Sequence, residues 1–286
     1  VKDRRGNTMA TNEYDASGRV VKQTLADGGT YLFAYTVDGT GKITQVDVTD
    51  PRGVVERKVF NTTGYITSRV FALGTPEQQT VTTERQAGTN LVLSETDALG
   101  RKTTYAYDAN GNVTIITRLA GTAEAITETY TYEPSFQQLA TRTDALNRTT
   151  TFSYDAIGNL VQASNPLSQK ITFDYNGAGQ ISKITDQLSN TIQFDYVGSD
   201  LYTVTDPLMR TTTWFTDIIG RPVAVTNPLG NPSFAEFDTL DRTTKTINPS
   251  GGAVSLAYDG NGNLLSLTDP NGNTTQHAYD SRNRLI

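Results

Sequence analysis

The strongest constraint on this sequence is a short motif that recurs along the whole chain. An aromatic residue is often followed by Asp, a Gly, Asn or Asp comes about four residues after the aromatic position, and apolar and polar residues then alternate. The clearest copies begin at Tyr14, Tyr107, Tyr154, Tyr258 and Tyr279. Such a period is typical of repeat proteins, in which each unit rests on its neighbours. We therefore expect one continuous array over residues 1–286, truncated at both ends, in place of two ordinary domains.

Alignment on the aromatic position gives thirteen copies spaced by 20 to 25 residues. Arg85 and Thr216 are degenerate copies that their flanking residues place in the register. The aligned positions are Tyr14, Tyr35, Phe60, Arg85, Tyr107, Tyr132, Tyr154, Tyr175, Tyr196, Thr216, Phe237, Tyr258 and Tyr279. The residues that we assign to the structural motif are Tyr14, Asp15, Gly18, Tyr107, Asp108, Gly111, Tyr154, Asp155, Gly158, Tyr175, Gly179, Tyr196, Asp217, Gly220, Phe237, Asp238, Tyr258, Asp259, Gly262, Tyr279 and Asp280.

A second signal, Asp or Asn followed by Pro or Ala and often by Gly, lies between the copies, for example at Asp50, Asp206 and Asn227. Both signals have the composition of turns, and the segments between them alternate as strands do. No window shows a sustained helical period. The sequence predicts an all-β array of antiparallel hairpins with almost no helix. Two interruptions, at 73–77 and 119–123, predict extended hairpin tips.

The strand before each motif turn carries aromatic residues two positions apart, as at Tyr105 and Tyr107 or Phe194 and Tyr196. Side chains alternate along a strand, so we expect these rings to collect on one face of the sheet. In the turn itself, we expect Asp to accept backbone N–H bonds and Gly to supply a positive φ.

The recurring Asp could instead form a row of catalytic carboxylates, but glycosidases use one unequal pair in a cleft and not an even series. Calcium is a second alternative, because the segments from Asp108 and Asp259 resemble the start of an EF-hand loop. They lack the Gly at the sixth position and the Glu at the twelfth. We expect a structural role for the Asp residues, with no metal and no cofactor.

Catalysis has no candidate site in this sequence. The chain has no Cys and a single His, His277, which occupies a slot of the aromatic ladder. No nucleophile elbow, phosphate-binding loop or dinucleotide fingerprint is present. The formal net charge is −6, and Lys and Arg are scattered, which argues against nucleic-acid binding. No apolar stretch is long enough for a membrane helix.

The combination of Tyr-Asp-x-x-Gly with Thr-Asp-Pro-x-Gly at a step of 21 residues resembles the YD or Rhs repeat proteins. This family includes bacterial polymorphic toxins, shell components of insecticidal toxin complexes and animal teneurins. The resemblance implies a curved, spiralling β-sheet shell that, in bacterial members, encloses a C-terminal toxin domain. Such toxins cut themselves at paired Asp-Pro-x-Gly-Leu motifs. The most similar segment of this chain begins at Asp269 and has the sequence of an ordinary turn between repeats, so we assign no self-cleavage site.

Two readings of function follow. The first is a non-catalytic shell segment of a secreted or cell-surface bacterial protein. Its partners would be the remainder of its own shell and an enclosed toxin, with a secretion-system component, a chaperone or glycans as further candidates. The alternative is an adhesion or carbohydrate-binding module, in which aromatic rings stack on sugars. At about 4.8 Å per strand the array would measure about 125 Å, which suits one turn of a shell and not a sealed container.

Overall fold

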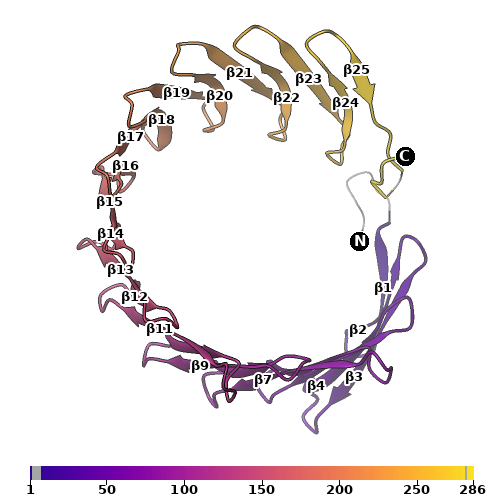
Figure 1. Ribbon diagram of the computed structural model, residues 1–286. Helices are drawn as coiled ribbons and strands as arrows, with labels where there is room; N and C mark the ends of the chain where they lie inside the picture. Colours follow the sequence, from indigo (N-terminus) through magenta and orange to yellow (C-terminus); the bar gives the residue numbers. More distant parts are fainter. Residues whose placement is uncertain (2–7, 281) are drawn as a thin grey trace. The chain divides into compact units, whose positions relative to one another are not determined.

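The computed structural model describes Val1 and residues 8–280 and 282–286, and these residues form strands and turns without a helix. Its contacts divide the chain into two compact units, one covering residues 8–151 and the other residues 152–286. Within each unit, consecutive strands pair antiparallel with one another (Figure 1). The all-β hairpin architecture expected from the sequence is therefore confirmed, whereas the single continuous array stays a prediction.

The strands are short and regular. The first unit contains β1 (Ala10–Tyr14), β2 (Val20–Leu25), β3 (Thr30–Val37), β4 (Ile43–Thr49), β5 (Val55–Phe60), β6 (Ile66–Phe71), β7 (Gln79–Arg85), β8 (Val92–Thr96), β9 (Lys102–Tyr107), β10 (Val113–Arg118), β11 (Ile126–Tyr132) and β12 (Leu139–Thr143). Strand β13 (Thr149–Tyr154) crosses the boundary. The second unit contains β14 (Leu160–Ser164), β15 (Lys170–Tyr175), β16 (Ile181–Thr185), β17 (Thr191–Val197), β18 (Asp200–Thr205), β19 (Thr211–Thr216), β20 (Pro222–Thr226), β21 (Pro232–Phe237), β22 (Thr243–Ile247), β23 (Ala253–Tyr258), β24 (Leu264–Thr268) and β25 (Thr274–Gln276).

The two hairpins of each repeat differ in register. Across a motif turn, the described pairings contain a β-bulge, as between β15 and β16, where Asp174 pairs with Lys183 but Tyr175 pairs with Ile181. Across the other turn the register is regular, as between β16 and β17. A bulge leaves one residue unpaired and increases the local twist of the sheet. The repeat therefore introduces a bend at every second hairpin.

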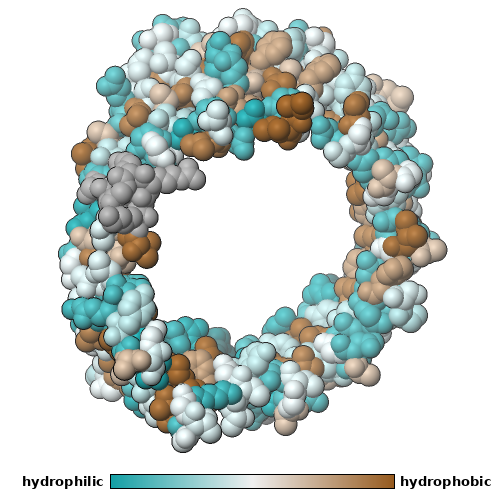
Figure 2. Space-filling view, turned by 180° about the vertical axis from the view of Figure 1, so that it is seen from behind, coloured by the Kyte–Doolittle hydropathy of each residue, from teal (hydrophilic) through white to brown (hydrophobic). Residues whose placement is uncertain are grey.

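The sheet is one layer thick and has almost no buried core. Ala10 is the only buried apolar residue in the described part of the chain, and Ser94 and Ser164 are the buried polar ones. The accessible surface is 17709 Å², against roughly 12,000 Å² for a compact protein of this mass. Hydrophobic and hydrophilic residues are interspersed over the visible face (Figure 2). Stability must come from contacts between neighbouring strands and turns.

Most aromatic residues before the motif turns lie on the more covered face of their strands, although Tyr14 is exposed. In β17, Phe194 and Tyr196 are half-buried, while Gln193, Asp195 and Val197 between and beside them are exposed. Strand β11 shows the same alternation. Longer turns replace the standard turn between β6 and β7 and between β10 and β11, where the sequence predicted extended tips.

We predict that the positive φ at the fourth position of the turn determines which substitutions this position tolerates. Gly230 has a φ of 81°, and nothing lies within 4 Å of a Cβ added there, so Gly230→Ala should cost about 1 kcal/mol through backbone strain alone. Met209 occupies the same position in the preceding turn of this type with a φ of 62°. Because it already carries the strain, Met209→Ala should change the free energy of unfolding by less than about 0.5 kcal/mol. Urea unfolding measures both, and equal losses would contradict the assignment.

Candidate functional site

The repeated turn is closed by one acidic side chain. In the turn that begins at Asp217, the backbone N–H of Asp217 donates to the carbonyl of Arg221 at 2.9 Å, and that of Gly220 donates to the carbonyl of Asp217 at 3.0 Å. Oδ1 of Asp217 accepts the N–H groups of Ile219 and Arg221 at 3.0 and 3.1 Å. The carboxylate therefore satisfies backbone donors that the turn leaves free.

The second turn of the repeat has the same geometry. Oδ1 of Asp206 accepts the N–H groups of Leu208 and Arg210 at 2.9 and 3.0 Å. Where Asn replaces Asp, the amide oxygen takes the same role, as in Asn227. The sequence distinguished two turn signals, but most repeats use the same turn at both positions.

The fifth residue of the turn completes the arrangement, and the sequence analysis assigned it no role. Its side chain donates to the second carboxylate oxygen, as when Nε of Arg221 donates to Oδ2 of Asp217 at 2.7 Å. The signal was the Arg or Asn that follows the fourth residue of the turn in many copies, whether or not that residue is glycine. Arg takes this role at Arg19, Arg101, Arg148, Arg210, Arg242 and Arg284, and Asn takes it at Asn112, Asn159, Asn190, Asn263 and Asn273.

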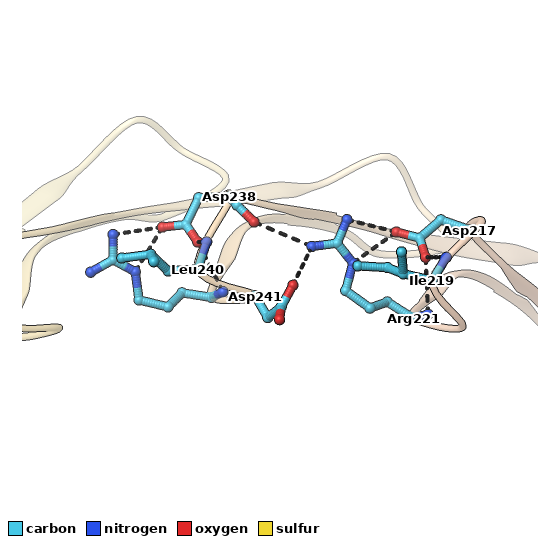
Figure 3. Close-up of polar contacts among 7 residues, drawn as sticks. Asp217, Ile219, Arg221, Asp238, Leu240 and Asp241 are labelled. Atoms are coloured by element: carbon cyan, nitrogen blue, oxygen red, sulfur yellow. Dashed lines mark hydrogen bonds and ion pairs between the residues drawn. The ribbon is translucent and has the colours of Figure 1, made fainter.

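The motif turns are linked to one another at one edge of the sheet. The guanidinium of Arg221 holds its own Asp217 and also donates to the carbonyl of Asp238, at 3.2 Å, and to the carboxylate of Asp241, at 2.8 Å (Figure 3). One repeat later, Arg242 donates to the carbonyl of Asp259 at 2.7 Å. Each arginine thus joins one repeat to the next.

Amide side chains make the same link in other copies. Nδ2 of Asn112 donates to Oε1 of Gln137 at 2.9 Å, and Nδ2 of Asn263 donates to Oδ1 of Asn283 at 2.9 Å. In the first unit, Nδ2 of Asn61 reaches Oδ1 of Asn90 at 2.8 Å. We call this edge, which contains the turns that begin at Asp217, Asp238 and Asp259, the motif-turn row.

The opposite edge is less connected. Arg101, Arg148 and Arg210 each bond to the aspartate of their own turn, and their side chains are 61% exposed. The side chains of Arg221 and Arg242 in the motif-turn row are only 27% and 24% exposed. The two edges therefore share a turn but differ in how far neighbouring turns stabilise one another.

The motif tyrosines bind the preceding repeat. The hydroxyl of Tyr175 donates to the carbonyl of Leu160 at 2.9 Å, and that of Tyr196 donates to the carbonyl of Ile181 at 2.9 Å. Tyr35, Tyr107 and Tyr132 make the equivalent bond. In the degenerate copy, Nε of Arg85 donates to the carbonyl of Ile66 at 3.1 Å. A different donor thus makes the same bond.

Arginines of the motif-turn row also stack on aromatic residues of the following repeat. The guanidinium carbons of Arg221 and Arg242 lie 4.9 and 4.8 Å from the ring centroids of Phe237 and Tyr258. Arg19 stands over Tyr35 at 5.1 Å. Cation–π contacts of this kind add to the hydrogen bonds between repeats. The rings expected to line a face are therefore engaged in contacts between repeats.

The predicted motif residues thus fall into a common arrangement. The aspartates and glycines of the motif lie in the turns, and the aromatic residues lie at the end of the strand before them. Tyr279 lies outside the named strands, in an isolated bridge to Leu285. The backbone N–H of His277, the other residue singled out, donates to the carbonyl of Leu265 at 2.9 Å, and its side chain is half-buried.

Hydrogen bonds hold the turn carboxylates in the ionised form. Side-chain and backbone donation from Arg148 lowers the pKa of Asp144 to about 2, and Arg284 lowers that of Asp280 to about 2. Desolvation raises the pKa of Asp217, but the hydrogen bonds from Arg221 and Ile219 and the charge of Arg221 together lower it below its ordinary value. Carboxylates of such low pKa are poor general acids at neutral pH. In the described residues, no three His, Cys, Asp or Glu side chains gather as metal ligands.

A sugar-stacking surface is not evident among the described rings. The clearest pair, Tyr202 and Phe215, meets edge to face, with centroids 5.9 Å apart and planes at 84°. They border a shallow hollow of about 250 Å³ beside Trp214. An edge-to-face pair offers no flat platform, so carbohydrate binding stays a prediction without structural support.

We predict that Arg221→Gln destabilises the protein more than Arg210→Gln. Both arginines hold the aspartate of their own turn, but Arg221 also contacts Asp238, Asp241 and the ring of Phe237. Thermal unfolding followed by circular dichroism compares the midpoints. Equal midpoints for the two variants would show that the links between motif turns contribute nothing to stability.

We predict that Tyr175→Phe lowers the free energy of unfolding by about 1 kcal/mol, because the carbonyl of Leu160 loses its hydroxyl donor. Tyr14→Phe is the matched control: its ring is 60% exposed and its hydroxyl accepts from Asn12 of the same strand. That variant should stay within about 0.5 kcal/mol of the parent. Urea unfolding of both variants provides the measurement.

We predict a pH-dependent role for Asp144. Its folded pKa of about 2 lies below the ordinary value of 3.8, so its contribution to stability is fully present above pH 3.8 and is lost as the pH falls through 2. Asp144→Asn should have a lower melting temperature than the parent at pH 7, and the difference between the two melting temperatures should narrow between pH 4 and pH 2. Arg148→Gln should show the same narrowing, whereas a constant gap for both would argue against the ion pair.

No described helix has the length and apolar character to span a membrane. Residues 88–123, 135–170, 154–191 and 258–286 match the family model of the RHS repeat. No curated protein matches the sequence.

Two solved structures share the fold. The crystal structure of TcdB2-TccC3-Cdc42 aligns with a TM-score of 0.75 at 14% identity, covering 98% of this chain and 17% of that one. The crystal structure of TcdB2-TccC3 without its hypervariable C-terminal region aligns with a TM-score of 0.74 at 16% identity, over 98% of this chain and 17% of that one. This chain therefore spans about a sixth of the length of the proteins that it resembles. The chain therefore contains RHS repeats, and it shares the hairpin fold of these structures.

Proposed function

We propose that this chain is a non-catalytic wall segment of an Rhs-type shell. The observation that carries the proposal is the combination of a single-layer sheet with linked motif turns. The sheet has almost no buried core of its own among the described residues. Its repeats are instead joined to their neighbours by arginine, amide and tyrosine contacts. Such a sheet suits a wall, in which strength along the array matters more than a packed interior.

The match to the RHS repeat and the fold of the TcdB2-TccC3 structures support this role. We further propose that the protein containing this segment is secreted or displayed outside the cell, and that its wall surrounds a C-terminal effector domain. The remainder of the same shell and the enclosed domain would then be its partners.

Cryo-electron microscopy of the whole protein that contains this segment tests the proposal. We expect a hollow particle in which these repeats form part of the wall, with density for a further domain inside. A solid interior or an extended rod would overturn the wall assignment. A hollow particle with a bulky domain outside would retain the wall and overturn the enclosure of an effector.

Protease protection provides a second measurement. An enclosed domain should resist digestion in the intact protein and become sensitive in a variant whose wall is weakened by Arg221→Gln with Arg242→Gln. The double variant Arg148→Gln with Arg210→Gln is the control, because those arginines bond only within their own turns in the described contacts. Rapid digestion of the domain in the unmodified protein would count against enclosure.

A further inference from the structure

Four consecutive turns of the second unit carry a leucine at their third position, on the edge opposite the motif-turn row. They are Leu167, Leu188, Leu208 and Leu229, which we call the leucine row. Their exposed fractions are 78%, 74%, 71% and 85%. In the first unit, Leu99 and Leu146 occupy the same position and are similarly exposed. A regular row of exposed apolar side chains is a candidate interaction surface, whereas single exposed apolar residues are common.

The turn does not need leucine at this position. Arg52, Ser250 and Asn271 occupy it in other turns of the same kind, and each donates its backbone N–H to the first turn residue at 2.9 to 3.1 Å. The four leucines make the same bond at 2.8 to 3.0 Å. Leucine is therefore not required by the local backbone, and its exposure shows that it packs little against its own unit.

The shared turn geometry orients the four side chains alike. Successive turns of this edge are two strands apart, so the leucines should repeat at about 10 Å. A partner that contacts all of them must carry features with the same period. A second leucine row meets this condition, because the leucines of one row fit between those of the other.

Charge permits such a contact between like surfaces. Three charged residues flank the leucine row in its four turns: Asp186, Asp206 and Arg210. Asp206 and Arg210 neutralise each other at 2.6 Å, and Asp186 is held by Asn190. Two copies of the row therefore meet with little electrostatic repulsion.

We propose that the leucine row is a homotypic interface, at which two copies of this chain associate edge to edge in an isologous pair. Eight leucines at on the order of 100 Å² apiece give roughly 800 Å² of buried surface. This area lies below the roughly 1,200 Å² of stable specific interfaces, so the association should be weak and visible only at high protein concentration. The proposal does not depend on what the wall encloses.

Sedimentation velocity over a range of concentrations tests the interface. We expect the unmodified chain to dimerise, and Leu188→Asn with Leu208→Asn to raise the dissociation constant at least about tenfold. Asn271 shows that the turn accepts this residue. The matched control is Ile157→Asn with Ile219→Asn, which alters exposed third positions of the motif-turn row, where Asn261 occurs naturally. The control should dimerise like the parent.

A chain that stays monomeric up to about 1 mM, or a control pair that weakens association equally, would overturn the proposal. So would a dimer that the leucine substitutions leave unchanged, since that result would point to the free strand edges.

Cysteine cross-linking gives a readout that does not rely on lost association. The chain has no cysteine, so Leu188→Cys and Ile157→Cys each introduce a single thiol. Under mild oxidation the Leu188→Cys protein should form the disulfide-linked dimer at least about tenfold faster than the Ile157→Cys protein. Equal rates would show that the leucine rows of two copies meet no more often than their motif-turn rows do.

Discussion

This structure depends above all on one side chain that accepts two backbone N–H groups at the start of most turns. The side chain of Asp or Asn at this position closes the loop between two strands. The backbone N–H of the same residue donates to the carbonyl of the fifth residue, and its carbonyl accepts the N–H of the fourth. A short loop would otherwise leave several backbone donors without partners, and such groups are costly wherever water is restricted. Because the turn is stable in itself, the chain can reverse direction every ten residues or so without a hydrophobic core beneath it.

The two turns of each repeat have the same backbone, yet they give the sheet two different edges. At the motif-turn row, the fifth residue reaches beyond its own carboxylate to the next turn, as Arg221 does to Asp238 and Asp241 (Figure 3). At the other edge, Arg210 stops at Asp206 and the adjacent leucine faces solvent. The motif-turn edge therefore contributes more contacts along the array than the opposite edge does.

The sequence predicted the strands, the hairpins and the turn positions, because turn chemistry and strand alternation are local properties. It also placed the degenerate copies at Arg85 and Thr216 in register. It did not predict the contacts between repeats. The hydroxyl of Tyr175 binds the carbonyl of Leu160, fifteen residues earlier, and the guanidinium of Arg85 makes the equivalent bond. Both depend on how far the bulged hairpin brings neighbouring strands together, and no sequence pattern states that distance.

The sequence by itself therefore determined the repeat, the secondary structure and the residues of the turn, since each follows from preferences expressed within a few positions. Only the tertiary structure decided that the two turn signals are one turn, that the motif aromatics and arginines join consecutive repeats, and that the two edges differ. The reason is physical: side chains about twenty residues apart meet only after strands have paired and bulged, so their partners are set by three-dimensional spacing. The motif that first suggested a row of acids is the joint by which one repeat holds the next.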